Sequence, residues 1–123
     1  MIRCSSDEDR WQCSVTNGAS ETTADTAKSG GSGEGFRPHE LLEGALASCL
    51  NVTARMAAEA EGIKLDGVTT TVDLRRSADR TEFAYTCDLD GVSEREADVL
   101  RDALSDCPIQ RTLSKEIGFE AAD

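Results

Sequence analysis

Apolar and small residues recur in steps of four and three along residues 38–61, which is the spacing of one face of an α-helix. Pro38 suits the first position of a helix, where no N–H is needed, and Gly62 suits the residue that ends one. The spacing therefore predicts a central helix over 38–61, roughly 35 Å long at 1.5 Å per residue. Its expected buried face consists of Leu42, Leu46, Cys49, Thr53, Met56 and Ala60.

Two other regions alternate between apolar and polar residues, as strands do. In the first, residues 3–16 and 19–27 flank Asn17-Gly18, a dipeptide that favours tight hairpin turns. The second region, 67–91, is rich in Val, Thr and aromatic residues. We expect an N-terminal β-hairpin over 1–27, a loop rich in Gly and Ser over 28–37, and a second β-hairpin over 67–91.

The remaining part of the chain predicts helices and a final strand. Ser93 and Glu96 have the spacing of a capping box, in which each side chain accepts from a backbone N–H of the other residue. Pro108 ends this helix and can open a further short one. The apolar face of the first of these helices is formed by Val99, Leu100, Ala103 and Leu104. We expect helices within 93–115 and a strand over 117–122, so that residues 1–123 form a single α+β domain with helices packed on antiparallel sheet.

The charge pattern excludes some functions. The chain has 24 Asp and Glu against 13 Lys and Arg, a net charge of −11, which argues against binding to nucleic acid. The acidic residues are spread along the chain and only three of the basic ones are Lys, which suits a protein adapted to high internal salt; an ordinary acidic protein is the alternative. No apolar run is long enough to cross a membrane and no leader opens the chain, so we expect a soluble, cytoplasmic protein.

Cysteine and histidine usage points to thiol chemistry rather than to metal binding. Five cysteines are an odd number, and none forms a Cys-x-x-Cys pair, so a framework of structural disulfides is not expected. His39 is the only histidine, which makes a zinc site unexpected. We therefore expect no metal and no bound cofactor.

Two of the cysteines have contrasting settings. Cys107 precedes Pro108 and is the natural N-cap of a short helix, where backbone N–H groups and the helix dipole stabilise a thiolate; Arg111 lies about one turn further on. Cys49 lies in mid-helix, where desolvation disfavours a thiolate unless a cation or a hydrogen-bond donor is close. From these residues alone, each cysteine can serve either packing or chemistry.

The segments around these cysteines resemble the OsmC and organic-hydroperoxide-resistance (Ohr) family. RPHELLEGALASCLNVT is similar to that family's helix start with its Pro and Glu-Leu, which leads to a Cys inside a long helix. DCPIQRTL, whose cysteine lies 58 positions later, is similar to the family's Cys-Pro-[Val/Ile] followed by Thr-Leu. The resemblance covers roughly residues 30–119.

The resemblance implies an OsmC/Ohr-like fold, in which antiparallel sheets pack around a long central helix in an intertwined homodimer. It also implies an oxidative-stress peroxidase that reduces organic hydroperoxides and is recycled by an external dithiol. In such a cycle Cys49 is the attacking residue and Cys107 the resolving one.

This chain departs from the family pattern at one position and lacks a clear match at another. The family places Glu directly after the Pro, where this chain has His39, with Glu40 next. At about 100° per residue, Glu40 points about 180° away from Cys49, whereas His39 lies about 80° from it around the helix axis, so His39 takes the location of the Glu. His39 can then serve as a cation or a proton donor; an exposed first-turn residue without such a role is the alternative. The family's active-site Arg has Lys28 and Arg37 as candidates. A non-catalytic dimer that binds a small ligand or senses redox state therefore stays open beside the peroxidase.

Overall fold

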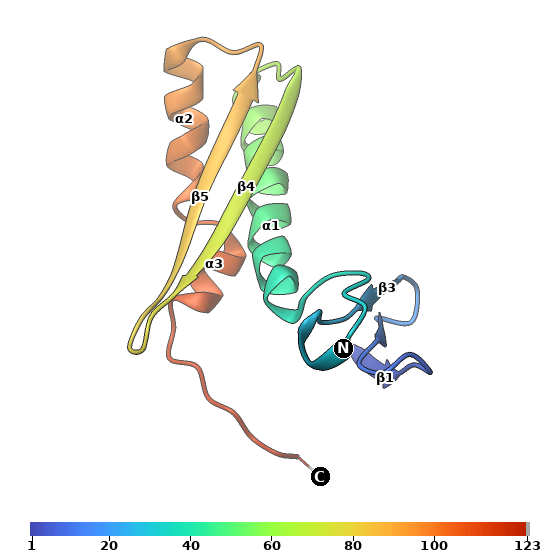
Figure 1. Ribbon diagram of the computed structural model, residues 1–123. Coiled ribbons are helices and arrows are strands. Elements are labelled where there is room, and N and C mark those ends of the chain that lie inside the picture. Colours follow the sequence, from blue (N-terminus) through green and yellow to red (C-terminus); the bar gives the residue numbers. More distant parts are fainter. Residues whose placement is uncertain (123) are drawn as a thin grey trace. The chain divides into compact units, whose positions relative to one another are not determined.

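The computed structural model describes residues 1–122 (Figure 1). Its contacts group into two compact units, Met1–Leu42 and Glu43–Asp123. The fold class is α+β, with small antiparallel sheets and a long helix, as the sequence predicts; that both units form one domain stays a prediction. The elements in order are β1 (Arg3–Ser6), β2 (Cys13–Thr16), β3 (Glu21–Ala24), η1 (Lys28–Gly30), α1 (Pro38–Glu61), β4 (Gly67–Arg76), β5 (Thr81–Asp90), α2 (Glu94–Leu104) and α3 (Pro108–Leu113).

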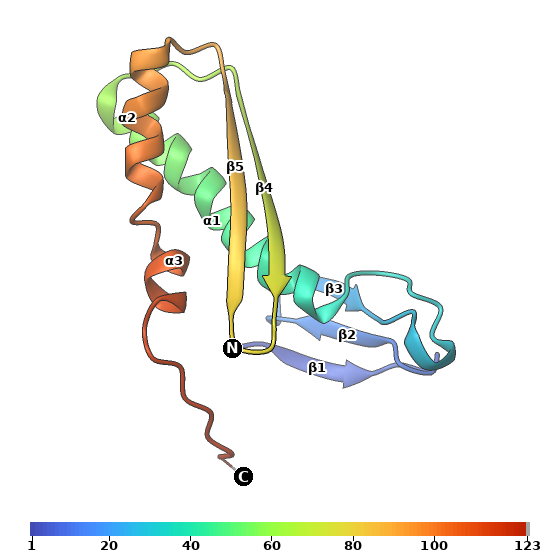
Figure 2. The same cartoon turned by 60° about the vertical axis from the view of Figure 1, so that its left-hand side comes forward.

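The first unit contains a three-stranded antiparallel sheet in the order β1-β2-β3 (Figure 2). The prediction of one strand over 3–16 is wrong, because the chain turns within it. The N–H of Asp7 donates to the carbonyl of Gln12 at 2.9 Å, and the N–H of Gln12 donates to the carbonyl of Asp9 at 2.8 Å. The acidic run between these residues has no apolar alternation to hold it in a sheet, so the region forms two short strands instead of one.

The predicted turn at Asn17-Gly18 is confirmed. The Asn17 Oδ1 accepts from the N–H groups of Ala19 and Ser20 at 2.9 and 2.7 Å. Gly18 has φ = 96°, a conformation that a side chain disfavours. This turn joins β2 to β3.

The loop over 28–37 is held in place by one carboxylate. Asp25 is buried, and its Oδ2 accepts from the Ser32 hydroxyl at 2.9 Å and from the Glu34 N–H at 3.1 Å. Gly35 allows the loop to lie against β3, since a Cβ there would lie 2.4 Å from the Thr23 carbonyl oxygen. The only helical turn in this loop is η1, so the predicted Gly- and Ser-rich connection is present but anchored at several points.

The second unit is built on the β4–β5 hairpin, which lies within the predicted range 67–91. The strands pair from Gly67 with Asp90 to Arg76 with Thr81. Side chains of one face pack with α1 and α2 into a core, and Figures 1 and 2 show both helices on the same side of the hairpin. The buried members of this core are Leu46, Leu50, Ala54, Cys87, Leu104 and Cys107.

The helix α1 has the predicted bounds, but the prediction of its buried face is wrong. Its buried residues are Leu46, Leu50, Ala54 and Ala58, a row in steps of four. Of the predicted face only Leu46 is buried, whereas Leu42 and Met56 are 44% and 67% exposed. Both rows of this helix consist of apolar or small residues, so the periodicity alone does not distinguish the row that meets the hairpin from its neighbour.

Three polar contacts hold α1 along the free edge of β4. The Glu43 Oε2 accepts from the Leu74 N–H at 2.8 Å. The Thr70 hydroxyl donates to the Ala47 carbonyl at 2.7 Å, and the Asn51 Nδ2 donates to the Val68 carbonyl at 3.0 Å. They satisfy strand groups that would otherwise lack a partner, and they fix the position of the helix along the sheet.

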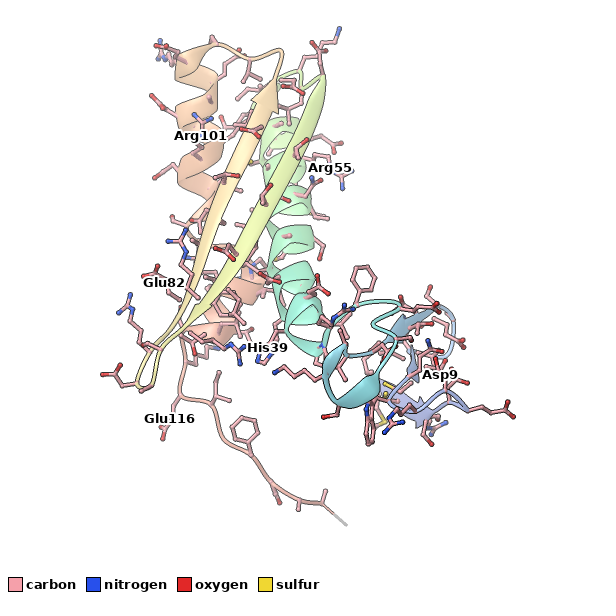
Figure 3. All side chains as sticks on the ribbon, viewed as in Figure 1. Asp9, His39, Arg55, Glu82, Arg101 and Glu116 are labelled. Carbon is pink, nitrogen blue, oxygen red and sulfur yellow. The ribbon has the colours of Figure 1, made fainter. Side chains whose placement is uncertain are left out.

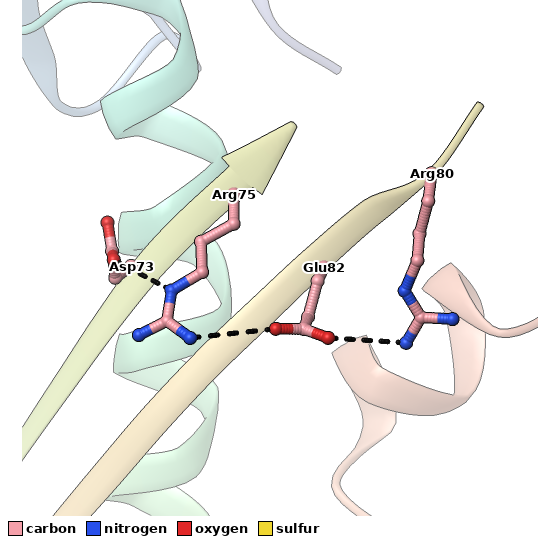
Figure 4. Close-up of polar contacts among 4 residues, drawn as sticks. All are labelled: Asp73, Arg75, Arg80 and Glu82. Atoms are coloured by element: carbon pink, nitrogen blue, oxygen red, sulfur yellow. Dashed lines mark hydrogen bonds and ion pairs between the residues drawn. The ribbon is translucent and has the colours of Figure 1, made fainter. Parts of the chain in front are cut away.

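Ion pairs join the two strands near the tip of the hairpin (Figure 4). Arg75 contacts Asp73 at 3.2 Å and Glu82 at 3.7 Å, and Arg80 contacts Glu82 at 3.3 Å. All four side chains are 45% to 73% exposed, so these pairs contribute little to stability.

Helix α2 begins as predicted. The Ser93 hydroxyl accepts from the Glu96 N–H at 3.2 Å and the Glu96 carboxylate accepts from the Ser93 N–H at 3.0 Å, which confirms the capping box. Leu100 and Leu104 of the predicted apolar face are buried, whereas Val99 is 42% exposed.

The strand expected over 117–122 is not formed. These residues leave α3 as an extended tail without regular structure (Figure 1), and Phe119 is 96% exposed. A strand needs a neighbouring strand for its backbone hydrogen bonds, and residues 117–122 pair with none of the described strands.

Candidate functional site

The second unit brings the thiols of Cys49 and Cys107 together. Cys49 lies in the middle of α1 and is partly exposed, whereas Cys107 is the N-cap of α3 and is fully buried. The Cys49 thiol is close enough to Cys107 to raise the pKa of the Cys107 thiol. Residues 58 positions apart in sequence thus form a local pair, with Cys49 on the solvent side.

The structure corrects the expectation that the helix end favours a thiolate at Cys107. Burial raises the pKa of the Cys107 thiol; the N–H groups of Gln110 and Ile109 act in the opposite direction, and the adjacent Cys49 raises it further. Arg111 does not offset this effect through a direct contact, because its guanidinium pairs with Asp106 at 3.6 Å. Burial therefore disfavours the thiolate form of Cys107.

The start of α3 instead donates a hydrogen bond to the Cys49 sulfur. The Ile109 N–H lies 3.5 Å from the Cys49 Sγ and donates to it. This backbone N–H in the first turn of α3 has no partner within the helix, so the Cys49 sulfur supplies one. Sequence reasoning missed this contact because the donor is a backbone group, although Cys107-Pro108 did mark the helix start that provides it.

Cys49 opens onto an apolar groove of about 780 Å³ in the second unit. One wall is the exposed row of α1 and the other is the start of α3. Its lining includes Ala45, Cys49, Val52, Met56, Pro108 and Ile109. A groove with such walls can hold an apolar group beside the Cys49 sulfur.

Three predicted site residues belong to the first unit. The Arg37 Nη1 donates to the carbonyls of Gly33 and Gly35 at 2.7 and 3.1 Å, so its guanidinium is bound within its own loop. Lys28 is exposed in η1, and His39 is exposed in the first turn of α1, where Figure 3 labels it. Their roles beside Cys49 stay predictions.

The other buried cysteine, Cys87, belongs to the same hydrophobic core as Cys107. Cys87 lies on β5 and is 8% exposed. Arg101, which is labelled in Figure 3, reaches from α2 and its Nη2 donates to the Cys87 carbonyl at 3.4 Å. Burial raises the pKa of the Cys87 thiol, which suits a packing residue.

Across residues 1–122, no group of three or more His, Cys, Asp or Glu side chains is arranged to hold a metal ion. Nor does this part of the chain contain a helix with the length and apolar character needed to span a bilayer.

Comparisons with known proteins agree on one family. The family model described as OsmC-like protein matches residues 31–121. The OsmC-like protein of Mycoplasma pneumoniae is similar in structure, with a TM-score of 0.72 and 22% identity over 92% of this chain and 85% of that one. No curated protein sequence gives a significant match.

Two further solved structures carry names that refer to hydroperoxides. The organic hydroperoxide resistance protein OsmC of Legionella pneumophila has a TM-score of 0.67 and 19% identity, over 93% of this chain and 88% of its own. The organic hydroperoxide resistance protein OhrB of Bacillus subtilis has a TM-score of 0.67 and 15% identity, over 93% of this chain and 90% of its own. At these identities the likeness is one of fold.

Proposed function

This chain belongs to the OsmC-like protein family, and we propose that it is a thiol-dependent peroxidase that reduces organic hydroperoxides through a cycle of two cysteines. The observation that carries the proposal is the pairing of the partly exposed Cys49 with the buried Cys107 at an apolar groove. The names of the similar hydroperoxide resistance proteins support the same substrate class.

In the first step the Cys49 thiolate attacks the outer oxygen of the hydroperoxide. The O–O bond breaks, the alkoxide takes up a proton and leaves as an alcohol, and Cys49 becomes a sulfenic acid. The Ile109 N–H, which lies 3.5 Å from the Cys49 Sγ, helps to hold this sulfur at the groove. The groove favours a hydroperoxide with an apolar substituent, since its walls contain mainly Ala, Val, Met and Ile side chains.

In the second step the Cys107 sulfur attacks the Cys49 sulfenic acid. A disulfide forms and water leaves, and an external dithiol then returns two electrons and two protons. Burial raises the pKa of the Cys107 thiol, which disfavours this residue as the sulfur that meets the peroxide first.

The proposal assigns His39 as the proton donor to the leaving alcohol, with Arg37 and Lys28 as the alternative cations beside Cys49. It also includes an intertwined homodimer, as the family resemblance implies. His39 stands where, by the resemblance, the peroxidases of the family have Glu.

The test is consumption of cumene hydroperoxide with a dithiol as reductant. Cys49→Ser should abolish turnover, and Cys107→Ser should allow one equivalent of peroxide to react before turnover stops. Cys87→Ser is the matched control, because it removes a buried core thiol outside the pair, and its rate should stay near wild type. Equal turnover in all of these proteins would overturn the proposal.

The alternative is a non-catalytic dimer that binds a small apolar ligand or senses redox state, and the exposed His39 in the Glu position favours it. Treatment with cumene hydroperoxide followed by a sulfenate-trapping reagent separates the two. Prompt labelling of Cys49 supports the peroxidase. An unmodified Cys49 together with saturable binding of an apolar fluorescent probe supports the alternative.

A further inference from the structure

Two cysteines that the peroxidase cycle does not use lie side by side in the first unit. Cys4 is on β1 and Cys13 is on β2, and these strands pair antiparallel with Cys4 opposite Val15 and Ser6 opposite Cys13. The two cysteines are therefore diagonal neighbours on one face of the sheet. Side chains in this relation lie within reach of each other across a strand pair.

We propose that Cys4 and Cys13 form a second redox-active dithiol, which small uncharged or cationic disulfides oxidise to an intramolecular disulfide between β1 and β2. Both residues are free thiols in this structure. The step is independent of Cys49 and Cys107 and does not need a peroxide.

The exposure of the two thiols differs, and this sets their order of reaction. Cys4 is exposed on an edge strand, whereas Cys13 is half-buried. Contact with the Cys4 thiol is the largest of the causes that raise the pKa of Cys13; burial and the charges of Asp25 and Asp7 raise it too. Cys4 is thus the thiol that meets a reagent first, and Cys13 follows.

The exchange balances without any other reactant. The Cys4 thiolate attacks one sulfur of the small disulfide, whose S–S bond breaks and releases one thiol. The Cys13 thiolate then attacks the Cys4 sulfur of the mixed disulfide and displaces the second thiol. Two electrons and two protons pass from Cys4 and Cys13 to the reagent.

The geometry allows the bond to close with a small movement. A disulfide needs Cα atoms within about 7 Å, which is near the usual diagonal spacing of about 7–8 Å in a sheet. β1 is four residues long, all of them exposed, and it is bound in the sheet only to β2, so it can shift toward its partner. The disulfide would close the turn formed by residues 7–12.

The charge around the pair selects the reagent. Asp7 and Asp25 both act on the Cys13 thiol and disfavour negative charge there. A cationic disulfide such as cystamine should therefore react about tenfold faster at low salt than the dicarboxylate dithiodiglycolate, and added salt should reduce the difference. Equal rates would overturn this preference.

The sequence makes the product easy to identify. Trypsin cleaves after Arg3, Arg10 and Lys28, so Cys4 and Cys13 fall in separate peptides, 4–10 and 11–28. Treatment of the folded full-length chain with cystamine, followed by alkylation and digestion, should give these two peptides joined by a disulfide. Separate cystamine adducts on both peptides, without the joined pair, would overturn the proposal.

A matched control moves one thiol to the other face of the sheet. Cys4→Ser combined with Ser5→Cys exchanges two neighbours, which keeps the composition of peptide 4–10 and reverses the direction of its thiol. This variant should lose the joined peptides while it still reacts with cystamine. Joined peptides in the same yield as in wild type would show that the register does not control the reaction and would overturn the proposal.

Discussion

Truncation of Leu50 should destabilise the chain far more than truncation of Met56, although both lie on α1 six residues apart. Leu50 is fully buried in the core against the hairpin, so Leu50→Ala leaves a cavity and should lower the free energy of unfolding by about 3 kcal/mol. Met56 is 67% exposed on the groove side. About a third of the usual 2–5 kcal/mol for a buried Met→Ala is about 1 kcal/mol.

Urea unfolding followed by circular dichroism measures both values, at several protein concentrations so that any contribution from association is visible. The comparison decides which row of α1 faces the core. Equal losses for the two variants would refute the reasoning, because the Met56 side would then be packed in solution rather than open as the wall of a groove.

Four other predictions concern the cap, the carboxylate, the thiols and the charge. Ser93→Ala removes the capping box of α2 and should lower the free energy of unfolding by about 1 kcal/mol, as measured by urea unfolding. An unchanged midpoint of unfolding would show that the capping box does not stabilise the chain. Desolvation acts to raise the pKa of Asp25, but hydrogen bonds from the Thr26 N–H, the Ser32 hydroxyl and the Glu34 N–H outweigh it and lower that pKa. The contribution of Asp25 to stability is therefore complete above its unfolded pKa of about 3.9 and is lost as the pH falls through its lower folded pKa. Asp25→Asn should thus make the free energy of unfolding depend less on pH in the acid range. Parallel plots of the free energy of unfolding against pH for the two proteins would contradict this. Iodoacetamide should modify Cys49 before Cys107 in the folded protein, as peptide mass analysis will show, because Cys107 is buried and its pKa is raised; the reverse order would contradict the assigned roles. Finally, the net charge of −11 makes the folded chain repel itself, and salt screens this repulsion, so the melting temperature should be higher in molar salt than in dilute buffer. An unchanged melting temperature would contradict this prediction.

Local patterns predict those elements whose signals lie within a few residues of each other. The bounds of α1 follow from Pro38, the apolar spacing and Gly62, and the start of α2 follows from the Ser93–Glu96 pair. Cys107 is the N-cap of α3 because Pro108 follows it. In each case the residues that decide the conformation are close neighbours in the chain.

Features that depend on distant contacts could not be predicted in the same way. The two rows of α1 are similar in composition, and only the hairpin decides that Leu50 rather than Cys49 enters the core. Residues 117–122 have the composition of a strand, but a strand also needs an edge to pair with. The support that Cys49 receives from the Ile109 N–H involves no side chain of Ile109, so no residue type in the sequence marks it.

The fully buried Cys107 sulfur is both a packing atom of the core and a member of the thiol pair. It fills part of the core beside Leu46, Leu50 and Leu104, and it lies next to the partly exposed Cys49 thiol. Any change at this atom is therefore also a change in the packing of the second unit, so reduced and oxidised molecules should differ in their resistance to heat and to proteases.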